Sequence, residues 1–284
     1  MQQILKWIKD SLAGYYPAGE IDAFIRLIFG EVCNYSLTDI LLRRDEELSG
    51  EVRERIETIV SRLQHYEPIQ YLLGVAYFGE LRMAVGPGVL IPRPETWEMV
   101  QRIVSEQGEV EGRVADFCTG SGCIAIALAK AWRKAAVEGW DFSSQALQYA
   151  RRNGEANGVE VQWRMQDLLA YEPATQPRYA VIVSNPPYVL DSERETMDDN
   201  VLRYEPHSAL FVPDDDPLLF YRAIARIACS ELLPGGALYC EINAAQGEMC
   251  KDLLRSCGME QVEVYRDFMG MDRVLKGIKP RVCE

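Results

Sequence analysis

The segment Asn185-Pro186-Pro187-Tyr188 combines residue types that could hold a planar NH2 group. It follows an apolar strand predicted over residues 179–183, and this strand must end here because proline cannot donate a hydrogen bond to a sheet. The two prolines restrict the backbone, so the Asn185 side-chain carbonyl and the Pro186 main-chain carbonyl become two fixed acceptors. The Tyr188 ring or hydroxyl would then lie beside the plane that carries the nitrogen. The alternative is a turn that only ends the strand.

A glycine-rich loop lies upstream, at Asp116-Phe117-Cys118-Thr119-Gly120-Ser121-Gly122, between a predicted strand and a predicted helix. Its glycines, Gly120 and Gly122, let the backbone turn tightly and approach a ligand closely. The pattern Gly-x-Gly-x-x-Ala also occurs at dinucleotide sites, so the loop alone leaves a nicotinamide-dependent dehydrogenase open. That alternative has no clear catalytic His or Tyr/Lys pair, and it leaves the Asn185 segment unexplained.

Three aspartates stand at the ends of three successive predicted strands. Asp116 precedes the glycine loop and could face the ammonium group of a ligand. Asp141 comes about 20 residues after the glycines, where a carboxylate can accept hydrogen bonds from both hydroxyls of a ribose. Asp167 could accept from an exocyclic adenine amine. Each aspartate alone could equally be a helix cap or a surface carboxylate, but together they lie on one rim of the predicted sheet.

Alternating strands and helices would position these residues. We expect strands at residues 114–117, 135–140, 159–165, 179–183 and 237–242, helices from residues 122, 143, 218 and 246, and final strands near 262–265 and 273–276. This alternation predicts a doubly wound, mainly parallel sheet. Open sheets of this class bind ligands at the carboxyl ends of their strands, which is where the polar residues above are placed.

The first part of the chain predicts helices, because apolar residues such as Ile4, Ile8 and Leu12 recur at helical spacing. Alternation over residues 76–85, followed by the turn Gly86-Pro87-Gly88, predicts a small β-hairpin. We therefore expect a helical N-terminal domain at residues 1–66, a connector with a β-hairpin at 67–95, and an α/β domain at 96–284.

The composition restricts the partners of this 284-residue chain. Its formal net charge of −13 repels phosphate backbones and argues against direct binding of nucleic acid. No uncharged apolar run reaches membrane-spanning length, and no signal-peptide core is visible, so we expect no membrane association. The eight cysteines show no paired Cys-x-x-Cys motif, and Cys118 and Cys123 have no histidine nearby to complete a metal site. We expect a metal-free cytoplasmic monomer.

Together these motifs resemble the HemK/PrmC release-factor glutamine methyltransferases. The resemblance covers nearly the whole chain and rests on the Asp-x-x-Thr-Gly-Ser-Gly loop, Asp141, Asn185-Pro186-Pro187-Tyr188, Pro92-Arg93-Pro94-Glu95-Thr96, Glu67-Pro68-Ile69-Gln70-Tyr71 and Asp272-Arg273. It implies a class I methyltransferase fold with a Rossmann-like, mainly parallel sheet, and S-adenosyl-L-methionine as the methyl donor. It also implies that the acceptor is the glutamine amide of the Gly-Gly-Gln loop of bacterial class 1 peptide chain release factors, recognised in part by the N-terminal domain.

The resemblance also implies roles for individual residues. Cofactor binding is carried over to Asp116, Thr119, Gly120, Gly122, Asp141, Asp167 and Asn185. Acceptor binding is carried over to Asn185, Pro186, Pro187 and Tyr188, of which Asn185, Pro186 and Tyr188 would be catalytic. The chain departs from the family at Cys118, which stands where the loop usually has its first glycine, at Trp97 and at Met271.

Other functions remain open at the level of sequence. A glutamine methyltransferase that acts on a ribosomal protein would need the same residues. An adenine amino methyltransferase for DNA or RNA could use the same amine-binding geometry, although the acidic charge disfavours it. A non-enzymatic protein that only binds S-adenosylmethionine is the alternative from a different functional class.

Overall fold

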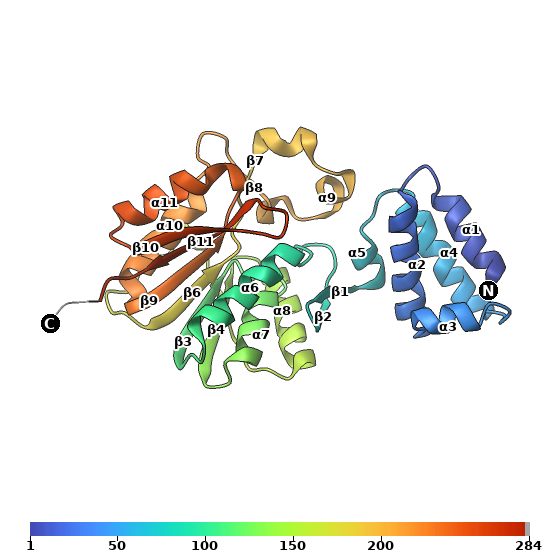
Figure 1. Cartoon of the computed structure of the whole chain (residues 1–284), viewed down its shortest axis with the longest axis horizontal. Coiled ribbons are helices and arrows are strands. Elements are labelled where there is room, and N and C mark those ends of the chain that lie inside the picture. Colours follow the sequence, from blue (N-terminus) through green and yellow to red (C-terminus); the bar gives the residue numbers. More distant parts are fainter. Residues whose placement is uncertain (282–284) are drawn as a thin grey trace. The chain divides into compact units, whose positions relative to one another are not determined.

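The computed structural model describes residues 1–281 and divides the chain into two compact units (Figure 1). The first unit contains Met1–Val75 together with Asp198–Tyr204, and the second contains Ala76–Met197 and the chain from Glu205 onward. The boundary at Val75 falls within the span 67–95 that the sequence predicts as a connector.

The first unit is helical, as the sequence predicts. Its helices are α1 (Gln2–Leu12), α2 (Ala18–Cys33), α3 (Leu37–Leu42), α4 (Gly50–Leu63), α5 (Ile69–Leu73) and α9 (Asp199–Tyr204). The apolar stripes of α1 to α5 meet in one core, in which Ile8, Ile28 and Ile56 are fully buried, whereas α9 contributes no buried residue to it. Helix α9 comes from the second half of the sequence, and its Tyr204 hydroxyl donates to the main-chain oxygen of His65 at 2.9 Å. This unit therefore has a hydrophobic core of its own.

The second unit contains a seven-stranded sheet in the order β10-β11-β9-β6-β3-β4-β5. The strands are β3 (Gly112–Phe117), β4 (Ala135–Asp141), β5 (Gln162–Met165), β6 (Tyr179–Ser184), β9 (Leu232–Glu241), β10 (Glu260–Arg266) and β11 (Asp272–Ile278). Strands β9, β6, β3, β4 and β5 are parallel, whereas β11 and β10 add an antiparallel edge. The predicted doubly wound, mainly parallel sheet is confirmed.

Helices cover both faces of this sheet (Figure 1). Helices α6 (Pro94–Gln107), α7 (Cys123–Ala131) and α8 (Ser144–Asn157) lie on one face, and α10 (Leu219–Glu231) and α11 (Gly247–Ser256) lie on the other. The central strands are mainly apolar because both faces are buried, and one exception within a strand is Glu138 of β4, which is buried and bound by Arg113. Polar side chains are therefore confined mainly to the strand ends.

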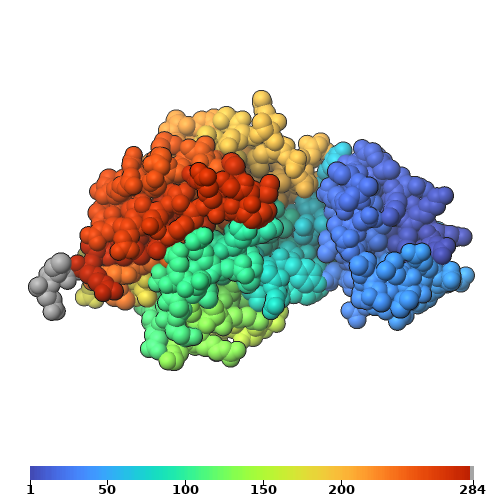
Figure 2. Space-filling model, in the orientation of Figure 1, coloured from blue at the N-terminus to red at the C-terminus, as the bar shows by residue number. Residues whose placement is uncertain are grey.

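Helix α6 also packs against the β10–β11 hairpin, and Figure 2 shows these segments directly beside each other. The Arg102 guanidinium lies 4.1 Å from the centre of the Tyr265 ring, and Lys276 Nζ lies 2.9 Å from Glu106 Oε2. These contacts fix the helix whose first turn carries Thr96.

The connector contains a hairpin, but the predicted position of its turn is wrong. Strands β1 (Val75–Phe78) and β2 (Leu81–Ala84) are joined through Gly79-Glu80, not through Gly86-Pro87-Gly88. Gly79 has a φ of 58°, and a Cβ atom there would lie 2.4 Å from the Trp97 ring, so glycine fits both the turn and the packing. Residues 88–90 instead line a pocket.

Short elements fill the long connection between β6 and α10. They are β7 (Val189–Leu190), the 3-10 helix η1 (Asp191–Thr196), η2 (His207–Ala209) and β8 (Phe211–Val212), and a further 3-10 helix, η3 (Ala244–Gln246), follows β9. No helix within residues 1–281 is long and apolar enough to span a membrane. Cys283 lies outside the described residues, and the other seven cysteines form no disulfide.

Candidate active site

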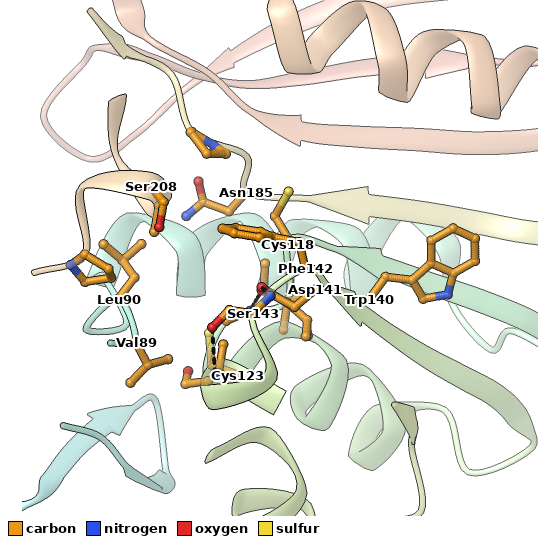
Figure 3. A pocket seen from close by; sticks show the side chains of 18 of the residues that line it. Val89, Leu90, Cys118, Cys123, Trp140, Asp141, Phe142, Ser143, Asn185 and Ser208 are labelled. Carbon is orange, nitrogen blue, oxygen red and sulfur yellow. Dashed lines mark hydrogen bonds between the residues drawn. The ribbon is translucent and has the colours of Figure 1, made fainter. Parts of the chain in front are cut away.

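A pocket lies at the carboxyl ends of β3, β4 and β6, within the second unit (Figure 3). The residues that line it include Val89, Leu90, Arg93 and Thr96 after β2, Cys118, Thr119 and Gly120 after β3, Asp141, Phe142 and Ser143 at the end of β4, Asp167 after β5, Asn185 and Pro187 after β6, and Ser208 and Ala209. Of the three aspartates on the predicted rim, Asp141 and Asp167 line this pocket and Asp116 does not. The carboxyl edge is where open parallel sheets bind ligands.

Asp116 holds the glycine loop from beneath. Its Oδ2 accepts hydrogen bonds from Thr119 Oγ1 at 2.5 Å and from the Ala125 main-chain nitrogen at 3.1 Å. Asp116 is fully buried and does not line the pocket, and its Oδ1 has no hydrogen-bond partner among the described residues. Burial raises the pKa of Asp116 to about 7. A cationic group of a ligand could satisfy this unpaired oxygen only after a shift of the glycine loop, because Asp116 does not reach the pocket.

The two loop glycines have different environments. Gly120 has a φ of 54° and lines the pocket. Gly122, with a φ of 83°, precedes α7 and does not line it. A Cβ atom on Gly122 would lie 2.7 Å from the Trp163 ring and 3.1 Å from the Ala150 Cβ. Gly122 therefore allows close packing of α7 against β5 and α8.

Asp141 connects the glycine loop to the segment after β4. Its Oδ2 accepts from the Gly120 main-chain nitrogen and its Oδ1 from that of Ser143, both at 2.9 Å. The side chain is buried, and burial raises its pKa. Since a carboxylate oxygen can accept more than one hydrogen bond, both oxygens retain capacity for a ligand.

Two neighbouring side chains differ from Asp141 in exposure. Phe142 is 52% exposed and presents an apolar ring to the pocket, a feature that sequence reasoning missed. Asp167 also lines the pocket, but it is exposed, and its Oδ1 accepts from the Leu169 main-chain nitrogen at 2.9 Å. Asp167 thus begins a turn and also faces the pocket.

A smaller pocket adjoins the first, and the Asn185 segment lies between them. It is lined by Leu90, Arg93, Asn185, Pro186, Tyr188, Val189, Ala209, Leu210 and Glu241, of which Leu90, Arg93, Asn185 and Ala209 also line the larger pocket. The two prolines are buried, whereas Asn185 and Tyr188 are partly exposed. A group bound in the smaller pocket would therefore meet a ligand of the larger one at Asn185.

Thr96 and Glu241 connect the Asn185 segment to the interior. Asn185 Nδ2 donates to Thr96 Oγ1 at 3.2 Å, and Thr96 Oγ1 donates to Glu241 Oε2 at 2.6 Å. The Tyr188 hydroxyl donates to Glu241 Oε1 at 3.0 Å. Sequence analysis missed this role for both residues. The available signals were a threonine ending the Pro-Arg-Pro-Glu-Thr motif and a carboxylate ending an apolar strand.

A second buried carboxylate joins two walls of the pockets. Glu205 accepts from Arg93 Nη2 at 2.6 Å and from the Ile91 main-chain nitrogen at 3.0 Å. It therefore attaches the segment after β2 to the segment that carries Ser208. Within residues 1–281, no group of three or more His, Cys, Asp or Glu side chains is arranged to hold a metal ion.

Comparisons with known proteins extend over both units. Residues 3–74 match the model of the PrmC N-terminal domain, and residues 98–203 match that of the methyltransferase small domain. The release factor glutamine methyltransferase of Bacteroides thetaiotaomicron is 45% identical over 278 residues, covering 97% of this chain and 99% of that protein. That of Flavobacterium psychrophilum is 38% identical over 271 residues, covering 94% and 95%.

A solved structure supports the fold. The ribosomal protein L11 methylase of Lactobacillus delbrueckii subsp. bulgaricus superimposes with a TM-score of 0.51 at 18% identity, covering 73% of this chain and 98% of that one. At this identity the likeness concerns the methyltransferase fold alone. The near-complete coverage at 45% identity goes further. This chain belongs to the release factor glutamine methyltransferase family.

Proposed function

We propose that this protein transfers a methyl group from S-adenosyl-L-methionine to the side-chain amide nitrogen of the glutamine in the Gly-Gly-Gln motif of bacterial class 1 peptide chain release factors. The observation that carries this proposal is the position of Asn185 at the junction of two pockets. One pocket has a glycine loop and a buried carboxylate suited to a nucleoside, and the other is lined by Pro186 and Tyr188. The relatives named above bear the name of this activity.

The residues of the larger pocket fit S-adenosylmethionine. Beneath the pocket, the unpaired Oδ1 of Asp116 would accept from the ammonium group of its methionine part once the glycine loop shifts to expose it. Asp141 would accept from the ribose hydroxyls, and Phe142 would offer its exposed ring to the adenine face. Asp167 would accept from the adenine amine, while Thr119, Gly120 and Gly122 shape the loop. When bound, the cofactor supplies an electrophilic methyl group on a sulfonium.

The Asn185 segment would prepare the acceptor nitrogen. A carboxamide nitrogen is a poor nucleophile because its lone pair is delocalised into the carbonyl. Two acceptors, Asn185 Oδ1 and the Pro186 main-chain oxygen, would orient the NH2 group and stabilise the positive charge that develops on it. Pro187 fixes this backbone, and Tyr188 would lie against the plane of the amide. The methylated amide can lose its proton to water, so the site needs no histidine.

Three further assignments belong to this proposal. Residues 1–66 would recognise the protein substrate, and residues 67–95 would connect them to the methyltransferase domain at 96–284. The protein would act in the cytoplasm as a monomer, without contacting nucleic acid. The relatives named above are methyltransferases by name, which gives no support to the dehydrogenase alternative. A ribosomal-protein substrate would use the same pocket chemistry, so only an experiment can distinguish it from a release factor.

Mass analysis of the substrate tests this proposal. Purified release factor incubated with enzyme and S-adenosylmethionine should gain one methyl group, mapped to the Gly-Gly-Gln glutamine. Asn185→Ala should lower the turnover by about 100-fold or more, as for the loss of a transition-state hydrogen-bond partner, with cofactor affinity nearly unchanged. Methylation of ribosomal proteins but not of release factors would refute the assignment of release factors as the substrate. If Asn185→Ala methylates at the wild-type single-turnover rate, the Asn185 segment has no catalytic role and only ends the strand.

A further inference from the structure

Glu241 is a buried carboxylate that the proposed chemistry does not yet use. It ends β9, is 2% exposed, and both of its oxygens accept hydrogen bonds from hydroxyl groups of the acceptor site. Thr96 donates to Oε2, and Tyr188 donates to Oε1. Thr96 is itself 2% exposed, so neither water nor another group competes readily for its proton.

These contacts dictate the direction of each hydrogen bond. A threonine hydroxyl has a single proton, and at Thr96 this proton is donated to the carboxylate. Thr96 Oγ1 can then only accept from Asn185, so the NH2 side of the Asn185 amide must face Thr96. The Asn185 Oδ1 consequently faces away from Thr96. This is the orientation required of an acceptor for a substrate NH2 group.

We infer that Glu241 is a positioning residue: through Thr96 it fixes the orientation of the Asn185 amide with Oδ1 available to the substrate, and it holds the Tyr188 hydroxyl at the same time. This inference rests on the proposed function and extends it to two residues that do not touch the reacting atoms. Asn185 alone could present either its oxygen or its NH2 group to the pocket. The buried carboxylate removes that freedom.

Only a group that accepts at both ends can satisfy both hydroxyls in this way. A glutamine at position 241 has nearly the same shape, but it places an oxygen at one end and an NH2 group at the other. It must therefore reverse the hydrogen bond of either Thr96 or Tyr188. If the Thr96 hydrogen bond is reversed, the Thr96 hydroxyl donates toward Asn185 and favours the opposite orientation of the Asn185 amide. The Asn185 NH2 group would then face the NH2 group of the substrate.

The test compares four variants of the full-length enzyme, each assayed by single-turnover methylation of release factor at saturating S-adenosylmethionine. Glu241→Gln is expected to lower the rate by roughly 10- to 100-fold, the scale of a misdirected transition-state partner. Thr96→Val, which removes the hydroxyl but keeps the shape, should lower it by about 10-fold. Thr96→Ser, which keeps a hydroxyl at this position, should retain most of the wild-type rate. The cofactor dissociation constant should stay within about 2-fold in all three.

Glu231→Gln is the matched control. Glu231 is also fully buried and is bound by Arg178 at 2.6 Å and the Tyr171 hydroxyl at 2.8 Å. Arg178 precedes β6, so this carboxylate lies at the opposite end of the strand that leads to Asn185. Its substitution should reduce thermal stability without changing the rate per folded molecule.

The outcomes separate the inference from the proposed function. If the wild-type enzyme does not methylate the release factor glutamine, the proposed function fails. If the wild-type enzyme is active and Glu241→Gln and Thr96→Val retain its rate, the positioning role is refuted. It is also refuted if Thr96→Ser is as slow as Thr96→Val, or if the rates fall only in proportion to cofactor affinity. Should Glu241→Gln fail to fold, the Thr96 pair decides alone.

Discussion

Replacing Asp141 by alanine tests how the larger pocket binds its nucleoside. Asp141 accepts one main-chain N–H on each oxygen, from Gly120 and from Ser143, and each oxygen retains capacity for a ribose hydroxyl. The substitution therefore removes the proposed ligand contacts and two bonds that shape the loop. A useful experiment must separate these two effects.

The magnitude follows from the type of hydrogen bond. Bonds to a charged acceptor contribute about 1.5–3 kcal/mol, so loss of the ribose contact at Asp141 should raise the dissociation constant of S-adenosylmethionine by roughly 10- to 150-fold. The hydrogen bonds that Asp141 accepts from Gly120 and Ser143 order the loop whichever ligand is bound. Their loss should appear as a lower Tm and as a smaller, ligand-independent loss of affinity.

Titration calorimetry with two ligands makes the distinction. Asp141→Ala should strongly weaken binding of S-adenosylmethionine, but it should weaken binding of the 2′,3′-dideoxy analogue much less. Asp252→Ala, at an exposed position on α11, is the matched control and should change neither affinity. An unchanged affinity for S-adenosylmethionine in Asp141→Ala would remove this carboxylate from the site. Equal losses for both ligands would mean that Asp141 acts only on the loop.

Two other predictions concern protonation and substrate recognition. Because burial raises the pKa of Asp116 to about 7, pairing with the cofactor ammonium should release a proton on binding near pH 6, and affinity should be roughly 10-fold weaker at pH 6 than at pH 8. Calorimetry in buffers of different ionisation enthalpy measures this, and a pH-independent affinity would contradict it. A chain starting at Ala76 should bind S-adenosylmethionine and methylate a Gly-Gly-Gln peptide normally but whole release factor poorly, since specific protein interfaces bury about 1,200–2,000 Å². Equal rates on whole release factor would refute recognition by the N-terminal helices.

The pocket could be predicted from sequence because it depends on local order. Strand and helix alternate along the chain, and the carboxyl ends of parallel strands share one edge, so residues such as Asp141 and Asn185 are placed together without knowledge of the strand order. Helical spacing likewise identified the core of the first unit. In both cases each element is recognised from its own local sequence, and no contact between distant segments has to be known.

What the sequence could not provide are contacts between distant segments. Thr96 and Glu241 are 145 residues apart, and their hydrogen bond depends on where α6 meets β9. Similarly, the sequence predicts the hairpin turn at Gly86-Pro87-Gly88, whereas the turn lies at Gly79-Glu80, because both segments are plausible turns. Packing of Gly79 against Trp97 favours the turn at Gly79-Glu80, and that contact is not local.

Contacts between distant segments also determine the conformation of the glycine loop at Cys118. Cys118 has a φ of 58°, in the left-handed region that costs a non-glycine residue roughly 1–2 kcal/mol. The following residues are anchored: Thr119 N donates to the Trp140 main-chain oxygen and Gly120 N donates to Asp141, each at 2.9 Å. These bonds, together with the Asp116 contacts beneath the loop, hold the backbone in place and offset the strain. The cysteine therefore keeps the left-handed conformation that glycine readily adopts, and the loop retains its position at the pocket.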